Sequence, residues 1–228
     1  MITIARSRDH DRQNTHSTPN ASERLSGRDT IGGIGAQFSG INRALWFIHF
    51  GLNYGFGPLA KGGTATGAIN GSASGPVSGH SRTLNLRFGK GFRVSPGVII
   101  GPYFAYQYAQ FSAELGPYSL TYTNNGAGGG FYGAVAATKA LTFLAHADYL
   151  VSTSTSASFS GTKIPNMPGA GVLQLGAKVD YRMTHDYSLF AGVEYDRYTA
   201  SYTVPFGTAH VNGKIQEIRG LVGLAYHY

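Results

Sequence analysis

The sequence predicts an all-β fold, namely a closed antiparallel up-and-down transmembrane β-barrel of about eight strands, with ten strands also compatible. Three observations lead to this prediction. The chain of 228 residues contains 33 Gly, 15 Tyr and 13 Phe, a composition that favours strands over helices. Long segments alternate large apolar residues with small or polar ones. The connections between those segments are alternately short and long, as in a membrane barrel.

The chain divides into two parts near residue 40. Residues 1–40 are polar and show no periodicity, so we expect an unstructured N-terminal segment. Residues 41–228 are expected to form one barrel domain. The polar segment lacks the apolar core of a secretory signal, which favours an error in the definition of the chain start. The alternative is that the protein is not exported.

Eight segments show the alternation of a strand with two different faces. In residues 43–56, for example, Trp46 and Phe50 fall on one face, while His49 and Asn53 fall on the other. The predicted strands are residues 43–56, 82–92, 98–108, 127–138, 141–151, 172–183, 187–198 and 214–228.

The lengths of the connections distinguish the two ends of the predicted barrel. Three of them are tight turns, at residues 93–97, 138–140 and 184–186. The other four are long and rich in Gly, Ser, Thr and Pro. If consecutive strands are antiparallel neighbours, every short turn lies at one end and every long loop at the other. Residues 119–123 could extend a strand or add a hairpin, and this leaves ten strands open.

The apolar faces are predicted to meet lipid. A soluble lipocalin-like barrel that binds an apolar ligand is the alternative, but its outer faces would be crowded with charged residues. Here charged residues make up only 13% of the chain and lie scattered among Gly, Ala and Gln. Aromatic residues gather near both ends of the strands, as at the two interfaces of a bilayer. No apolar run approaches the roughly 20 residues of a membrane-spanning helix.

The final strand carries the most specific motif. In "GLAYHY" a glycine is followed after two residues by an aromatic residue and then by a terminal aromatic residue, at Gly223, Tyr226 and Tyr228. With this motif, residues 42–228 resemble the small outer-membrane β-barrels of Gram-negative bacteria, typified by the OmpA transmembrane domain and OmpX. The resemblance implies that the barrel-assembly machinery reads this strand. Leu221 departs from the family, which usually has a polar residue there.

Nine ionisable residues fall on the small-residue faces and are predicted to point into the lumen. They are Arg87, His146, Asp148, Lys178, Asp180, Glu194, Asp196, Glu217 and Arg219. An isolated buried charge costs several kcal/mol, so these groups must pair in a narrow interior. The favoured interpretation is a salt-bridge network that fills the lumen. The alternative is a small diffusion pore that the same residues line.

Catalysis is not predicted. His146 and Asp148 lie two residues apart on one face and could form a catalytic or metal-binding pair, but no third ligand or nucleophile is recognisable from the spacing. Lipid A deacylases are barrels of similar size that use a His and a Ser, and the chain has no equivalent His-x-Ser on a strand. We therefore predict no enzyme, no cofactor and no metal, and we keep a lipid A-modifying enzyme as the weaker alternative.

The long-loop end is predicted to carry a basic rim opposed by a single acid, Glu114. Its residues are Lys61, Arg82, Lys163, Arg197 and Lys214. Such a rim could contact lipopolysaccharide phosphates or an anionic host surface. The net charge of +7 is spread along the chain without a basic run, so no nucleic-acid partner is expected. The sequence thus predicts a monomeric outer-membrane barrel with a structural or surface-interaction role.

Overall fold

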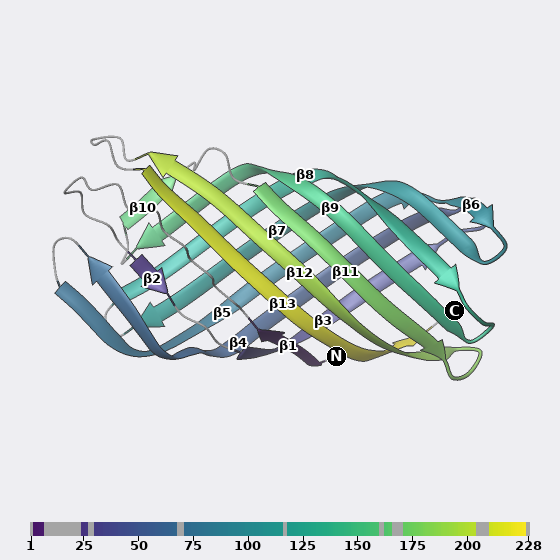
Figure 1. Cartoon of the computed structure of the whole chain (residues 1–228), viewed down its shortest axis with the longest axis horizontal. Helices are drawn as coiled ribbons and strands as arrows, with labels where there is room; N and C mark the ends of the chain where they lie inside the picture. The colour runs from purple at the N-terminus through teal and green to yellow at the C-terminus, as the bar shows by residue number, and fades with distance from the viewer. Residues whose placement is uncertain are drawn as a thin grey trace.

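The computed structural model of the chain consists of β-strands joined by turns (Figure 1). It describes residues 2–6, 24–26, 30–67, 71–115, 118–159, 162–165, 171–203 and 210–226, and side chains over 33–57, 78–114, 119, 121–158, 171–199 and 216–225. The strands are β1 (Ile2–Arg6), β2 (Arg24–Ser26), β3 (Thr30–Ile41), β4 (Trp46–Gly67), β5 (Gly71–Lys90), β6 (Phe92–Ser95), β7 (Val98–Leu115), β8 (Tyr118–Ala136), β9 (Leu141–Phe159), β10 (Thr162–Pro165), β11 (Gly171–Arg182), β12 (Tyr187–Thr203) and β13 (His210–Tyr226). Within these ranges no helix is long and apolar enough to span a bilayer.

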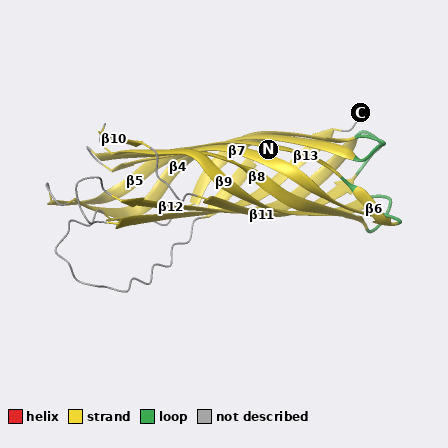
Figure 2. Ribbon diagram, turned by 90° about the horizontal axis from the view of Figure 1, so that it is seen from above, coloured by secondary structure: helices red, strands yellow, loops and turns green. Residues whose placement is uncertain are grey.

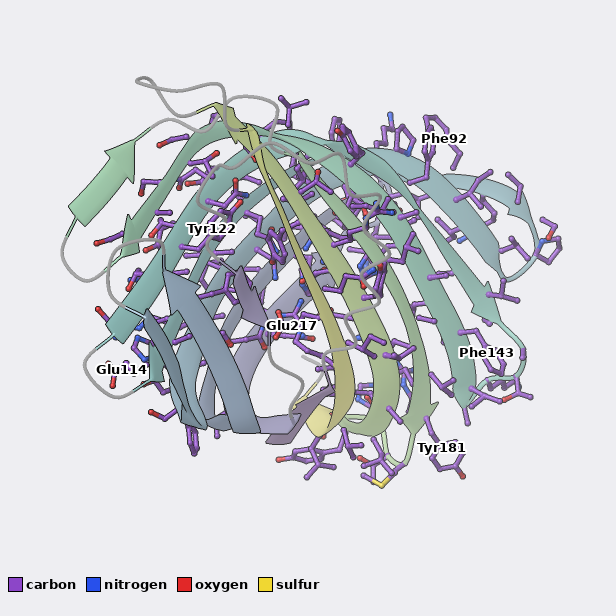
Figure 3. All side chains as sticks on the ribbon, turned by 60° about the vertical axis from the view of Figure 1, so that its left-hand side comes forward. Phe92, Glu114, Tyr122, Phe143, Tyr181 and Glu217 are labelled. Atoms are coloured by element: carbon purple, nitrogen blue, oxygen red, sulfur yellow. The ribbon has the colours of Figure 1, made fainter. Side chains whose placement is uncertain are left out.

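Nine long strands form one antiparallel up-and-down sheet in which consecutive strands are neighbours. Their order is β3, β4, β5, β7, β8, β9, β11, β12 and β13. Short β1 pairs in antiparallel fashion with both β13 and β3. The sheet curls around a long axis, so that it has a convex outer face and a concave inner face (Figures 2 and 3). The predicted all-β antiparallel architecture is therefore confirmed.

The eight predicted segments each overlap one of the long strands, but β3 does not correspond to any of them. Residues 1–40 were expected to be unstructured, whereas the structure has β1, β2 and all but the last residue of β3 within them. On the exposed side of β3 the apolar residues are Ile34 and Phe38, separated by Ala36. Glycines fill much of the rest of this strand, so the alternation is too weak to identify it from the sequence.

The predicted long loops are largely extensions of the strands. Strands β4 and β5 stay paired out to Gly67 and Gly71, although two register shifts interrupt their ladder. Strands β7 and β8 stay paired out to Leu115 and Tyr118. These segments are rich in Gly, Ser and Thr, so the sequence predicted loops. They nevertheless form paired strands, because backbone hydrogen bonds between strands need no large side chains. The ends of these hairpins lie together at the left of Figure 1.

The opposite end of the sheet holds the short turns (Figure 1, right). Side-chain oxygens stabilise them by accepting backbone hydrogen bonds. Asn42 Oδ1 accepts from the Trp46 N–H at 3.0 Å, and Thr138 Oγ1 accepts from the Leu141 N–H at 3.0 Å. Thr184 Oγ1 accepts from the Tyr187 N–H at 3.1 Å. We call this the turn end and the other the hairpin end.

The usual distribution of polar and apolar residues is inverted. On the outer face Leu224 is 68% exposed and Phe131 is 69% exposed. On the inner face Asp196 is 1% exposed and Arg219 is 3% exposed. A domain that folds in water buries its apolar side chains and exposes its charges. The outer face of this sheet is therefore suited to apolar surroundings.

The exposed apolar residues form a band around the outer face. On β4 the band extends from Trp46 to Phe56, and on β9 it extends from Phe143 to Val151. These lengths match the roughly 9–11 residues with which a tilted strand crosses a bilayer. Aromatic residues mark both margins, for instance Trp46 at the turn end, stacked on Phe88 with ring centroids 5.2 Å apart. We call this surface the apolar band.

Candidate functional site

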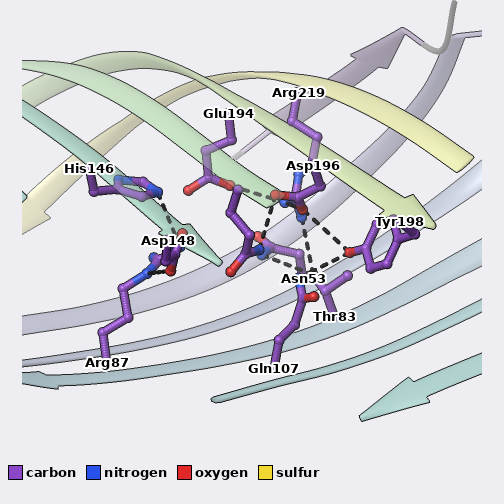
Figure 4. Close-up of polar contacts among 11 residues, drawn as sticks. Asn53, Thr83, Arg87, Gln107, His146, Asp148, Glu194, Asp196, Tyr198 and Arg219 are labelled. Carbon is purple, nitrogen blue, oxygen red and sulfur yellow. Dashed lines mark hydrogen bonds and ion pairs between the residues drawn. The ribbon is translucent and has the colours of Figure 1, made fainter. Parts of the chain in front are cut away.

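The inner face carries the nine ionisable residues that the sequence places in the lumen. They come from five strands, β5, β9, β11, β12 and β13. The side chains of Arg87, Asp148, Asp196, Glu217 and Arg219 are buried, and the other four are partly buried. They fall into separate groups, two of which contain an arginine that bridges distant strands (Figure 4).

The first group joins β5 to β9. Arg87 Nε donates to Asp148 Oδ2 at 3.0 Å, and Arg87 Nη2 lies 3.1 Å from His146 Nε2. A guanidinium has only donors, so His146 Nε2 accepts and the imidazole is neutral, with its proton on Nδ1. Strands β7 and β8 separate β5 from β9 in the sheet, so this contact crosses the interior. His146 and Asp148 thus share Arg87 rather than forming a free catalytic or metal-binding pair.

The second group surrounds Arg219 on β13. The guanidinium contacts the Asp196 carboxylate, and Arg219 Nη2 lies 3.3 Å from Glu194 Oε2. Arg219 Nη1 donates to Thr83 Oγ1 on β5 at 3.1 Å. Glu217 is also buried, and its Oε2 has no hydrogen-bond partner among the described residues. A single arginine thus lies in a region that contains three carboxyl groups.

Neutral side chains extend the second group across the interior. Gln107 Nε2 on β7 donates to the Tyr198 hydroxyl on β12 at 3.0 Å. The Tyr198 hydroxyl in turn donates to Asp196 Oδ2 at 3.4 Å, and Gln174 Nε2 donates to Asp196 Oδ1 at 3.0 Å. Sequence reasoning missed these partners because it considered only ionisable groups. The sequence does contain a signal for them, because Gln107 and Gln174 lie on the strand faces with small residues, which were predicted to point inward.

Aromatic side chains occupy the interior beside these polar groups. Nearer the turn end the rings of Phe47 and Tyr132 have centroids 4.1 Å apart, and those of Phe47 and Tyr103 are 5.6 Å apart. Toward the hairpin end Phe111 meets the Tyr198 ring edge-on at 5.0 Å. Aromatic rings and a layer of hydrogen-bonded polar side chains thus both lie in the described interior.

Among the side chains that the structure describes, Lys178 and Asp180 on β11 make no direct contact with either arginine group. Lys178 Nζ lies 5.1 Å from the centroid of the Phe190 ring, in a cation–π arrangement. Asp180 Oδ2 accepts a hydrogen bond from Ser188 Oγ at 3.1 Å. Among the described residues no three His, Cys, Asp or Glu side chains converge as a metal site would require.

The predicted basic rim is only partly described. Arg82 and Arg197 are both exposed, and Arg82 Cζ lies 5.7 Å from the centroid of the Tyr54 ring. Arg82 is on β5 and Arg197 is on β12, which are not neighbouring strands, so the two do not form one patch. The side chains of the remaining rim residues lie outside the described set, namely Lys61, Lys163 and Lys214.

The C-terminal motif is described only up to the end of β13. Gly223 pairs with Phe190 on β12, and a Cβ at Gly223 would lie 2.7 Å from Phe190 Cζ. The glycine therefore leaves room for the Phe190 ring on the inner face. Tyr226 is the last residue of β13, and Tyr228 lies outside the described residues.

Gly176 on β11 makes room for the first arginine group. A Cβ at this position would collide with the His146 ring. We expect Gly176→Ala to displace the imidazole from Arg87 and to lower the free energy of unfolding by about 1–3 kcal/mol. A Cβ at Gly133 would have its nearest neighbour 3.8 Å away, so Gly133→Ala is the control. Equal urea midpoints for the two variants in detergent micelles would contradict this packing.

Comparison with known proteins gives a likeness of fold. No protein-family model matches the sequence, and no curated protein matches it. The outer membrane protease OmpT from Escherichia coli superposes with a TM-score of 0.64 at 10% identity, over 100% of this chain and 92% of OmpT. The Pseudomonas putida toluene transporter TodX has a TM-score of 0.38 at 12% identity, over 100% of this chain and 70% of TodX. The OmpT match therefore shows that the chain shares the fold of an outer-membrane β-barrel protein.

Proposed function

We propose that this chain is an integral β-barrel protein of the bacterial outer membrane, with a structural or surface-interaction role and without catalysis. Two observations support the membrane placement: the apolar band on the outer face and the likeness of fold to an outer-membrane protein. The short turns would then face the periplasm, and the hairpin end would face the cell exterior.

In this proposal the barrel has ten strands, two more than the number favoured from the sequence. Strands β3 and β13, at the ends of the nine-strand sheet, run in the same direction, because an even number of antiparallel steps separates them. An antiparallel barrel needs an even number of strands, so one strand of the opposite direction must lie between them. The pairing of β1 with both β13 and β3 supports this closure.

We propose that the barrel is sealed and does not conduct ions. The support for this is a set of side-chain contacts that cross the interior. Arg219 on β13 bonds to Thr83 on β5, and Gln107 on β7 bonds to Tyr198 on β12. Both contacts join strands that are not neighbours in the sheet. A water-filled channel would keep such side chains against the wall and separated by solvent. The interior network therefore favours a structural role for the nine ionisable residues.

Conductance in planar bilayers tests this proposal. We expect the purified protein to insert without stepwise conductance, because the Gln107 to Tyr198 contact and the adjoining rings obstruct the lumen. A Gln107→Ala, Tyr198→Ala double variant should show small steps if it folds. Reproducible single-channel steps from the unaltered protein would instead support the diffusion pore.

Arg82 is the best described point for contact with anionic lipopolysaccharide. It lies on the outer face over Tyr54, and no acidic partner for it is described. We expect Arg82→Gln to weaken binding of purified lipopolysaccharide about fivefold at low salt, and salt to weaken binding by the unaltered protein. Lys90, over the Trp46 ring at the turn end, gives the matched control Lys90→Gln, with no expected change. Binding that is insensitive to salt would reject this contact.

The absence of catalysis is part of the proposal. OmpT is a protease, but a likeness of fold at 10% identity does not transfer its activity to this chain. What supports a non-catalytic role is that His146 Nε2 and Asp148 Oδ2 both bind Arg87. A change in lipid A mass after incubation with the purified protein would overturn this part of the proposal.

The last strand is proposed as the segment that the barrel-assembly machinery reads. Gly223 and Tyr226 lie on β13, in the pattern that the sequence resemblance identifies. We also propose that the protein is a monomer in outer-membrane lipid, because the apolar band suits acyl chains on every side of the barrel.

A further inference from the structure

Two arginines lie beyond the apolar band at the turn end, one on each of two adjoining segments. Arg43 lies in the turn between β3 and β4, and Arg93 lies on β6, which follows β5 after Gly91. The Gly91 N–H donates to the Leu45 carbonyl oxygen at 2.7 Å, so the two segments are held side by side. We call Arg43, Arg93 and the nearby Lys90 the basic corner.

Hydrogen bonds within the turn fix the position of Arg43. The Asn42 N–H donates to the Trp46 carbonyl oxygen at 2.9 Å, and the Leu45 N–H donates to the Asn42 carbonyl oxygen at 2.9 Å. The Asn42 side chain also accepts from the Trp46 N–H, as described above for the short turns. The backbone of Arg43 is therefore held at one place on the rim of the sheet.

The charges of the basic corner are not balanced within the protein. Residues 40–46 and 88–99 contain no Asp and no Glu. Among the described side chains, every ion pair involves Arg87, Arg219 or His185, and none involves the basic corner. All three of its cations are exposed. The basic corner therefore presents three positive charges to an external anion.

Exposed apolar side chains adjoin the basic corner. Phe92 is 54% exposed, Val94 is 56% exposed and Trp46 is 42% exposed. Figure 3 shows Phe92 at the edge of the molecule, and Figure 1 shows β6 at the turn end. Lys90 Nζ lies 5.5 Å from the centroid of the Trp46 ring. Cations beside aromatic and aliphatic side chains are typical of the level at which lipid headgroups meet acyl chains.

We propose that the basic corner binds the phosphate groups of anionic phospholipids, an inference that rests on the membrane placement proposed above. In that placement the turn end meets the periplasmic leaflet, so the phosphate comes from a phospholipid and not from lipopolysaccharide at the hairpin end. The guanidinium groups of Arg43 and Arg93 each offer a planar fork of donors that matches phosphate oxygens. A zwitterionic headgroup already carries a cation beside its phosphate, so a lipid with net negative charge binds better.

Trp46 provides a local reporter, because it is the single tryptophan of the chain and contacts Lys90. The full chain is folded into vesicles of phosphatidylglycerol and phosphatidylcholine in equal amounts, with bromine on the acyl chains of one lipid or the other. Bromine quenches fluorescence only at close range, so the ratio of the two quenching values measures which lipid is enriched at Trp46. We expect phosphatidylglycerol to be enriched at least about threefold at low salt, and high salt to remove the enrichment.

Two double variants test whether the arginines cause the enrichment. Arg43→Gln combined with Arg93→Gln should lower it at least about twofold. Arg82→Gln combined with Arg197→Gln is the matched control, because it removes the same charge from exposed positions nearer the hairpin end and should change nothing. Lys90 stays unaltered because it contacts the reporter ring. Equal enrichment in the two double variants would overturn the proposal.

The unaltered protein alone also decides the question, so a variant that does not fold leaves it open to test. If both brominated lipids quench Trp46 equally at low salt, the ring lies against acyl chains but the phosphate contact is rejected. If neither lipid quenches Trp46, the ring does not meet acyl chains, and the membrane placement fails together with the inference. The two failures are therefore distinguishable.

Discussion

Replacing Arg219 with methionine should destabilise the folded protein more than any other single substitution on the inner face. The change removes the cation that contacts Asp196 and Glu194 and that lies beside buried Glu217. Carboxylates left without a partner in a buried site are costly, and breaking such a group typically lowers the free energy of unfolding by about 3–5 kcal/mol. Urea unfolding in detergent micelles, followed by tryptophan fluorescence and gel mobility, measures this loss.

Companion variants separate the loss of charge from the loss of packing. Asp196→Asn combined with Arg219→Met removes one of the uncompensated carboxylates and should recover part of the loss. Arg219→Lys keeps the charge but cannot bond to Asp196 and Thr83 at the same time. Its free energy of unfolding should therefore lie between that of Arg219→Met and that of the unaltered protein. If Arg219→Met unfolds at the urea concentration of the unaltered protein, the buried ion group contributes nothing to stability.

Placing a charge on the apolar band should also be strongly destabilising. Val193 on β12 is 47% exposed and lies on the outer face, in register with Ala177 and Gly220. In a bilayer we expect Val193→Arg to lower the free energy of unfolding by about 2–4 kcal/mol, the cost of a cation on the lipid-facing surface of a barrel. If water met this face, the same change at so exposed a position would cost less than about 0.5 kcal/mol.

Ala137 provides the matched control for this prediction. It is exposed in the turn between β8 and β9, outside the apolar band, and its side chain makes no described contact. Ala137→Arg should therefore leave folding into lipid vesicles unchanged within about 0.5 kcal/mol. Equal folding yields and urea midpoints for Val193→Arg and Ala137→Arg would show that the outer face does not meet lipid.

The fold could be predicted in large part because large apolar residues alternate with small or polar residues along most strands. In β4 the succession from Trp46 to Phe56 assigns every side chain to the inner or outer face. The same alternation predicted that Arg87, Asp148 and Arg219 share the inner face. Strand β3 was missed because glycine makes no contribution to an alternating pattern. The hairpin extensions were missed because their ladders depend on the backbone and not on side-chain size.

The candidate site could be predicted only as a set of residues, not as a set of contacts. Arg219 bonds to Thr83 over a separation of 136 residues, and Arg87 bonds to Asp148 over 61. The partner that an inward side chain meets depends on the curvature of the sheet and on the stagger of its strands. Neither quantity is encoded in the alternation of one strand. The neutral members of the network, such as Gln107, become recognisable only when the opposite wall is known.

We propose above all that the apolar band faces lipid around a sealed, polar interior. The most direct test is to dilute the urea-unfolded chain into detergent micelles and, in parallel, into buffer without detergent. Circular dichroism and gel mobility with and without boiling then report the folded state. We predict a β spectrum and faster migration of the unboiled sample only where detergent is present. A monomer with the same β spectrum in detergent-free buffer would contradict the claim, because the apolar faces would then point inward.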